Sequence, residues 1–259
     1  MTIVFRLIGR RLYHFFYHLG SFGDMLWQTF KSLSDFRTYS SLIGEQMMRI
    51  GIQSIPIVIY IAAFAGMVTA IQSSENFDQF VPPYLIGFVV EKSILRELSA
   101  VLTALVLAGR VGASIAAELG TMRVTEQIDA LETLAFNPVS YLIVPRVIAG
   151  TFMFPVLVVF AGFIGMTAGW LTSIVVMDIT SVEFLKGARQ FADNKDFVLP
   201  LVKSVLFGMF ITLIACYQGF HSKGGAEGVG TAATNAAVTS CLMVLFLDFL
   251  IATLILFKL

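Results

Sequence analysis

The sequence has few charged residues and only two cysteines. Of its 259 residues, 13% are charged, whereas an average soluble domain carries roughly a quarter. The formal net charge is zero, which argues against nucleic acid as a partner, because nucleic-acid binding depends on a basic surface. Cys216 and Cys241 lie in apolar runs without a CxxC motif or a His companion, so we interpret them as small buried residues, not as disulfide partners or metal ligands.

Motifs for catalysis and nucleotide binding are also missing. The sequence contains no GxxxxGK[ST] phosphate loop, no HExxH motif and no GxSxG motif. We therefore expect no catalytic residues and no metal site on this chain, and any ATP chemistry must belong to another polypeptide. The alternative is an intramembrane lipid-modifying enzyme, which would need a nucleophile or a metal site within the apolar segments.

Apolar residues dominate instead. They make up 57% of the sequence, and the mean hydropathy is +0.85. Five runs are long enough to cross a hydrocarbon layer about 30 Å thick, and they lie at 51–72, 84–119, 147–177, 197–220 and 233–257. The second run would be roughly 50 Å long as one helix, so part of it must tilt, protrude or break. The prediction is an all-α integral membrane protein with five transmembrane helices.

The chain is predicted to be one domain over 1–259, with an N-terminal region at 1–48 and a transmembrane bundle at 49–259. The N-terminal region lacks the order of a signal peptide, so we expect it to be retained. It has a basic face opposite an apolar face, which predicts an amphipathic helix at the membrane interface. The basic face consists of Arg6, Arg10, His14 and His18.

The distribution of positive charge predicts the orientation in the membrane. Most Lys and Arg residues fall on the cytoplasmic side if the N-terminus is cytoplasmic. Only Lys186, Arg189 and Lys195 then fall in external loops. We therefore expect a cytoplasmic N-terminus and a periplasmic C-terminus.

The second apolar run begins with four charged residues, Glu91, Lys92, Arg96 and Glu97. Each would cost about 2.5 to 3.5 kcal/mol at the centre of a bilayer. We interpret Glu91 and Lys92 as the end of an overlong helix that stands above the bilayer. At about 100° per residue, a single polar stripe is expected to contain Lys92, Arg96, Ser99, Thr103, Arg110 and Ser114. Glu97 lies off this stripe, so we expect it to meet another helix, in this chain or in a second subunit.

Two further charges, Lys203 and Asp248, lie inside later apolar runs, in the half that is external in this orientation. Ionisable residues inside a membrane usually face the bundle interior or a watered cavity. We therefore predict a cavity that opens outward and receives the polar headgroup of an amphiphile. The predicted lipid site consists of Arg96, Glu97, Lys203, Asp248, Phe77, Phe80 and Thr103. Two alternatives stay open, a purely structural Lys203–Asp248 ion pair and interface anchoring by the two phenylalanines.

A short amphipathic segment separates the second and third runs. Three acids alternate there with three apolar residues at helical spacing, Thr125 can cap the helix, and Asn137 with Pro138 ends it. The pattern is typical of a solvated helix over a packed stripe, and also of a helix that receives force from a soluble partner. The predicted coupling residues are Arg123, Thr125, Glu126, Ile128, Asp129, Leu131, Glu132 and Leu134, with the apolar three filling a groove on that partner.

Residues 95–138, LRELSAVLTALVLAGRVGASIAAELGTMRVTEQIDALETLAFNP, closely resemble the signature of the MlaE (YrbE) permease family. The segment GFHSKGGAEGVGTAATNAAVTSCLMVLFLDFLIATLI resembles the last loop and span of that family. By motif, Arg96, Glu97, Lys203 and Asp248 fall at charged cavity positions, and 123–134 falls at the coupling helix. Two departures are Ser99-Ala100, where many relatives have Gly-Pro, and Asn235, where an Arg is frequent. The kink produced by Gly-Pro is therefore not expected here.

The resemblance implies a homodimeric permease in the bacterial inner membrane. A cytoplasmic ABC ATPase would bind at the TEQ segment, an MCE-domain protein would form a ring on the periplasmic side, and a small STAS-domain protein often joins the ATPase. The cargo would be phospholipid moving between the inner and outer membranes, which maintains outer-membrane asymmetry. This chain would hold no cofactor, because ATP and Mg would bind to the ATPase. A passive scaffold that anchors the periplasmic ring is a further alternative.

Overall fold

The computed structural model describes residue 16 and residues 20–32, 39–75 and 82–257, and within these ranges it contains helices and no strand. Five helical segments are long and apolar enough to span a membrane, which confirms the predicted number. They are Ser40–Glu75, Tyr84–Val124, Val139–Met177, Asn194–Phe220 and Gly225–Leu254. The observed helices extend beyond most of the predicted runs, because their ends carry polar residues that continue past the apolar stretch.

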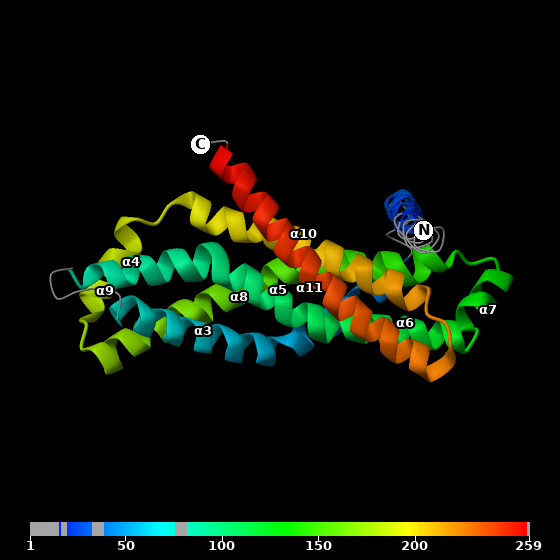
Figure 1. The fold of residues 1–259 in the computed structure, drawn as a ribbon, viewed down its shortest axis with the longest axis horizontal. Helices are drawn as coiled ribbons and strands as arrows, with labels where there is room; N and C mark the ends of the chain where they lie inside the picture. The colour runs from blue at the N-terminus through cyan, green and yellow to red at the C-terminus, as the bar shows by residue number, and fades with distance from the viewer. Residues whose placement is uncertain (1–15, 17–19, 33–38, 76–81, 258–259) are drawn as a thin grey trace, which may run out of the picture.

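Figure 1 shows an elongated bundle in which these segments run roughly lengthwise, with α7 (Gln127–Thr133) at one end and α4 (Tyr84–Ser93) with α9 (Ser181–Gln190) at the other. The first span consists of α2 (Ser40–Ile50), a 3-10 turn η2 (Ile52–Ser54) and α3 (Ile55–Glu75). The second consists of α4, α5 (Ser99–Leu107) and α6 (Ala113–Val124). The remaining long helices are α8 (Val144–Met177), α10 (Asn194–Phe220) and α11 (Gly225–Phe257).

Local sequence explains where several helices begin. Thr180 caps α9 by accepting a hydrogen bond from the Glu183 backbone N–H. Asp193 and Asp196 form a reciprocal capping box at the start of α10. Gly224 and Gly225, with φ of 95° and 69°, make the turn into α11 in a conformation that residues with a side chain rarely adopt.

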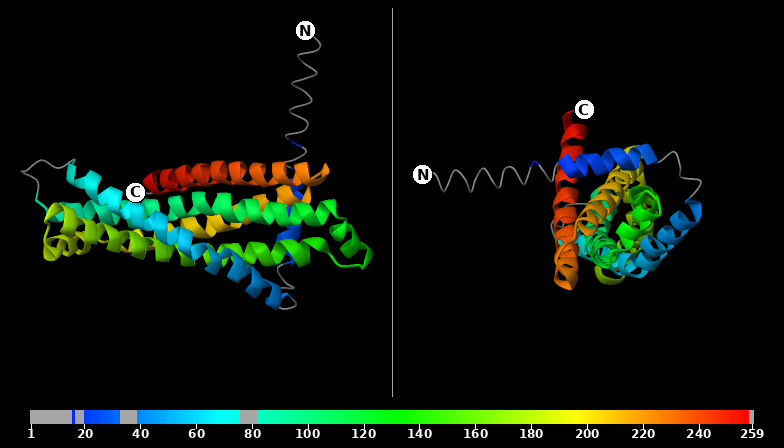
Figure 2. Two further views of the ribbon diagram at one scale, coloured as in Figure 1. Left: turned by 90° about the horizontal axis from the view of Figure 1, so that it is seen from below. Right: turned by 90° about the vertical axis from the view of Figure 1, so that its right-hand side faces the viewer.

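The predicted interfacial helix lies mainly outside the described residues, including its four basic positions. Residues 20–31 are helical and run across the long axis of the bundle (Figure 2). Met25 is buried, and the Phe22 ring contacts the Tyr217 ring edge-on, with 5.6 Å between centroids. Trp27 and Phe30 are exposed. This segment is therefore anchored to the bundle on one side and presents aromatic residues on the other.

The second span remains helical over 41 residues, but two π-helical turns interrupt its α-helical geometry. They are η3 (Ile94–Leu98) and η4 (Ala108–Gly112). Each π-turn adds a residue to the turn and rotates the following side chains relative to the preceding ones. The prediction of one polar stripe is therefore wrong: Lys92 contacts Asp196 of α10, whereas Arg110 contacts Ser54 of the first span.

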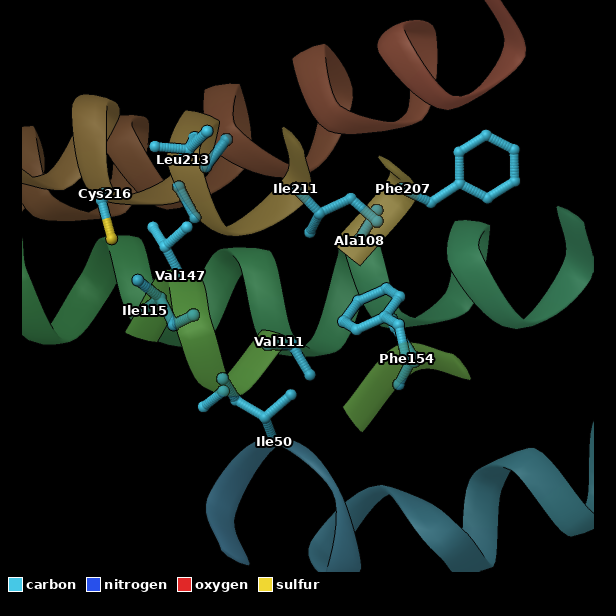
Figure 3. Close-up of a cluster of buried hydrophobic side chains, with 14 of the residues drawn as sticks. Ile50, Ala108, Val111, Ile115, Val147, Phe154, Phe207, Ile211, Leu213 and Cys216 are labelled. Carbon is cyan, nitrogen blue, oxygen red and sulfur yellow. The ribbon is translucent and has the colours of Figure 1, made fainter. Parts of the chain in front are cut away.

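The core lies between α6, α8 and α10, and Figure 3 shows side chains from these helices and from the first span meeting there. Cys216 is fully buried in this cluster next to Val147 and Ile115, as its apolar surroundings in the sequence predict. Phe154 and Phe207 fill its other side and are also fully buried. This core fixes the positions of the second and fourth spans, which carry most of the charged residues discussed below.

The backbones of α3 and α8 approach closely at Gly66 and Gly165. A Cβ atom on Gly66 would collide with the Gly165 carbonyl group, and one on Gly169 would meet Val90 and Gly66. The run of small residues that the sequence shows at Ala161, Gly165 and Gly169 therefore serves helix packing within one chain.

Candidate functional site

Lys203 on α10 lies between two carboxylates from other spans. Its Nζ is 2.6 Å from Glu97 Oε2 in η3 and 2.8 Å from Asp248 Oδ1 in α11. The Lys203 side chain is only 3% exposed, so its charge depends on these partners. The structure thus contains the Lys203–Asp248 pair that the sequence left open, and it adds Glu97, which meets another helix of the same chain.

The charged cluster of Glu97, Lys203 and Asp248 is open on one side. The Glu97 side chain is 44% exposed, and Asp248 Oδ1 approaches Lys203 without the geometry of a hydrogen bond. Both carboxylates therefore retain the capacity to accept a further donor. Next to Glu97, the half-buried Arg96 forms no hydrogen bond or ion pair with any other described residue. Glu97 can therefore receive an ammonium group, and Arg96 on the same π-turn, which interacts electrostatically with Asp196, can receive a phosphate.

The π-turn η3 contains both Arg96 and Glu97. Such turns occur often at functional sites, where they change the direction of side chains within a helix. The Ser99-Ala100 pair follows η3 directly, so the helix is irregular at this place without the Gly-Pro of many relatives. The segment 91–100 contains no proline or glycine, so its sequence does not predict the turn.

Glu91 and Lys92 pack against neighbouring helices, and their place above the bilayer on an overlong helix stays a prediction. Lys92 forms an ion pair with Asp196, which is 1% exposed, and Glu91 is 2% exposed. The physical reason is that α9 packs along α4 and the start of α10 reaches Lys92. Both Glu91 carboxylate oxygens and Asp196 Oδ1 lack a hydrogen-bond partner.

Of the remaining predicted lipid-site residues, Thr103 lies in the part of the chain that the structure describes. Thr103 is 3% exposed and borders a crevice of about 10 Å³ between α5, Ala62 of α3 and Ala161 of α8. This crevice is too small for a lipid, so the prediction that Thr103 lines the cavity is wrong for this chain. Phe77 and Phe80 lie outside the described residues.

The helix α7 has the predicted position but different ends. Its N-cap is Glu126, in a left-handed conformation with φ of 59°. Thr125 donates its hydroxyl hydrogen to the Thr121 carbonyl, so the predicted Thr125 cap is wrong. The helix ends at Thr133, before the Asn137-Pro138 pair. Asn137 instead accepts a hydrogen bond from the Val139 N–H and begins the next helix.

The side chains of α7 divide into an anchor and an exposed surface. Ile128 is fully buried in the core of this chain, so the prediction that it fills a groove on a partner is wrong. Leu131 is partly buried against the same core. Leu134 is 69% exposed, and Glu126 and Glu132 are also exposed.

An ion pair and two apolar residues complete this end of the bundle. Arg123 pairs with Asp129 and lies over the Phe220 ring, which links α6 to α7 and to the end of α10. Val124 and Phe136 are exposed as well, at 36% and 51%. Neither is among the predicted coupling residues, although Val124 lies within 123–134 and Phe136 follows that range closely.

Comparison with known proteins identifies the family. The profile described as Permease MlaE matches residues 43–254. The chain belongs to the MlaE permease family. A probable ABC transporter permease protein of Rickettsia prowazekii (strain Madrid E) is 41% identical over 248 residues, which cover 96% of each chain. A probable ABC transporter permease protein of Synechocystis sp. is 43% identical over 208 residues, 80% of this chain and 79% of that one.

A plant relative of this MlaE-family permease is the chloroplastic protein TRIGALACTOSYLDIACYLGLYCEROL 1 of Arabidopsis thaliana. It is 37% identical over 209 residues, which cover 81% of this chain and 60% of the plant protein. Together with the five membrane-length helices, the matches confirm the resemblance seen in the sequence. The chain is a multi-pass membrane protein and an ABC transporter permease, a type of subunit that works with an ATPase.

Proposed function

We propose that this permease moves phospholipids between the inner and outer bacterial membranes and so maintains outer-membrane lipid asymmetry. The observation that carries the proposal is the charged cluster around Lys203, placed within three membrane-length helices. A phospholipid headgroup brings a phosphate and often an ammonium group into an apolar surrounding. Arg96, on the same π-turn as Glu97, and the carboxylates of Glu97 and Asp248 offer the complementary charges.

The proposed assembly follows from the two ends of the bundle. A cytoplasmic ABC ATPase, which holds ATP and Mg, docks at α7, where Leu134, Phe136 and the exposed acids form an accessible surface. An MCE-domain protein docks at the opposite end near α9, and a STAS-domain protein binds the ATPase. The N-terminus is then cytoplasmic and the C-terminus periplasmic, in the bacterial inner membrane.

A second copy of the chain completes the proposed cavity. The last span, α11, has an exposed apolar face, and its Asp248 borders the charged cluster. Residues on that face include Val238, Leu242, Leu245, Phe246 and Phe249. A homodimer that brings two copies of the charged cluster together would shield the exposed side of Glu97 from water and leave space for an acyl chain.

The test is ATP-dependent phospholipid transfer in proteoliposomes that contain the permease and its partner ATPase. Asp248→Asn and Glu97→Gln should each slow transfer about tenfold or more, because charge-assisted hydrogen bonds are worth about 1.5 to 3 kcal/mol. Glu75→Gln at the end of α3 is the matched control, because it makes the same carboxylate-to-amide change at an exposed residue, and it should transfer lipid at the normal rate. Transfer that is normal in both cluster variants would refute the proposal.

Mass spectrometry of lipids that co-purify with the complex separates the proposal from the scaffold alternative. A permease should retain phospholipid in amounts that fall in the Asp248→Asn variant. A passive scaffold should retain none specifically, and its lipid content should be the same in the variant.

A further inference from the structure

A polar pocket lies between the first and second spans, in the half of the bundle nearer α7. Its volume is about 360 Å³, within the range of roughly 300 to 1,000 Å³ typical of small-molecule sites. The polar side chains that line it are Gln46, Arg49, Gln53, Arg110, Ser114 and Glu118. Arg110 follows Glu97 by 13 residues, roughly 20 Å along a helix, so this pocket is distinct from the charged cluster around Lys203.

Arg110 is the one ionised side chain of this pocket without an oppositely charged partner among the described residues. One of its guanidinium N–H groups donates to the Ser54 hydroxyl, and Ser54 in turn donates to the Ile50 carbonyl. A guanidinium group has five N–H donors, so most of them remain for a ligand. The π-turn η4 contains Arg110 and places it against the first span.

The other charges around the pocket neutralise one another. Arg49 lies 2.8 Å from Glu45 and 3.2 Å from Glu118, and Arg146 lies 3.0 Å from Glu118. Three arginines therefore face two glutamates, which leaves one net positive charge at Arg110. Arg110 is partly buried, and a partly buried charge without a counter-ion favours the binding of an anion.

We propose that this pocket binds a phosphate-type anion, which Arg110 holds by charge-assisted hydrogen bonds. Guanidinium and phosphate match in planar, bidentate geometry, and Gln53 and Ser114 can donate further hydrogen bonds. The source of the anion is either the headgroup of an anionic phospholipid or free phosphate. Anion binding at this pocket does not depend on the proposed transport function. In the proposed orientation, the pocket lies in the cytoplasmic leaflet, and this placement rests on that proposal.

The test uses the purified full chain and a phosphatidylglycerol probe with a photoactivatable headgroup, followed by peptide mapping. Crosslinks are expected on 46–53 and 110–118, and unlabelled phosphatidylglycerol should compete for them. Arg110→Gln, which removes the positive charge, and Ser114→Asp, which repels an anion, should each raise the concentration of unlabelled phosphatidylglycerol needed for competition about tenfold or more. Ser114 is exposed, so Ser114→Asp tests the site even if Arg110→Gln is unstable. The control Arg189→Gln should behave as the native chain.

Competition by inorganic phosphate identifies the source of the anion. If phosphate alone competes, the pocket binds a soluble anion, and if only phosphatidylglycerol competes, it binds a lipid headgroup; both results support the proposal. Equal competition by diacylglycerol, or unchanged competition in both pocket variants, would overturn it. Crosslinks on α10 and α11 report separately on the charged cluster around Lys203, so a failure of the proposed transport site would be recognised on its own.

Discussion

At the scale of single residues, Lys203 is expected to tolerate substitution poorly. It is almost fully buried and is the counter-ion of two carboxylates. The cost of placing a charge in lipid is enough to mark Glu97, Lys203 and Asp248 as unusual from sequence alone. The sequence predicts one site for all three and allows a Lys203–Asp248 pair, but the direct Glu97–Lys203 pair could not be predicted, because these residues are 106 residues apart and meet only through the packing of long helices.

Lys203→Met should lower the free energy of unfolding by about 3 kcal/mol, the lower end of the range for a broken buried ion pair, because Glu97 is partly exposed. Asp248→Asn should cost less, since Asp248 contacts Lys203 without hydrogen-bond geometry. Thermal unfolding of the purified protein in detergent measures both effects. Equal melting temperatures for Lys203→Met and the native chain would contradict the assigned role.

At the scale of elements, α7 is a short helix with one buried anchor and one exposed apolar residue. Ile128→Asp should destabilise the protein, because it buries an unpaired charge in the core. Leu134→Asp should leave thermal stability unchanged and weaken ATPase binding about tenfold or more, because it places a charge in the proposed interface. Co-purification and thermal unfolding give the two measurements. A destabilised Leu134→Asp variant would show that Leu134 also packs within the chain.

The contact between α3 and α8 gives a second prediction at this scale. Gly66→Ala should destabilise the protein by about 1 to 3 kcal/mol, because the added methyl group collides with the Gly165 carbonyl. The control is Gly44→Ala, since a Cβ on Gly44 meets no atom within 4 Å. Chemical unfolding of the two variants makes the comparison, and a Gly66→Ala variant as stable as Gly44→Ala would be inconsistent with this close approach.

The elements also show how far a periodic pattern can predict structure. Apolar run length predicts the five spans well, because it depends only on the cost of polar groups in hydrocarbon. The prediction of which side chains share a face is wrong in the second span. That prediction assumes 3.6 residues per turn, and two π-turns change this spacing. The prediction that Thr125 caps α7 is wrong for a similar reason, because Glu126 adopts a left-handed conformation that few non-glycine residues use.

At the scale of the whole molecule, the two ends of the bundle should lie on opposite sides of the membrane. A cysteine introduced by Thr133→Cys at the end of α7 should be labelled by an impermeant maleimide only in inside-out vesicles. Ala192→Cys, between α9 and α10, should be labelled only in right-side-out vesicles. Background labelling should be low, because Cys216 and Cys241 lie inside membrane-length helices. Labelling of both variants from one side would contradict the proposed topology.

Because Lys203 of α10 pairs with both Glu97 and Asp248, a movement of α11 would change the ion pairing of Asp248. If α11 moved away from α10, Asp248 would lose its counter-ion in an apolar surrounding, and the movement would be opposed. A cationic group arriving beside Asp248 would remove that opposition by replacing Lys203. Under the proposed transport function, the occupancy of the site and the freedom of the last span to move would therefore be coupled energetically, and a loaded subunit would rearrange more readily than an empty one.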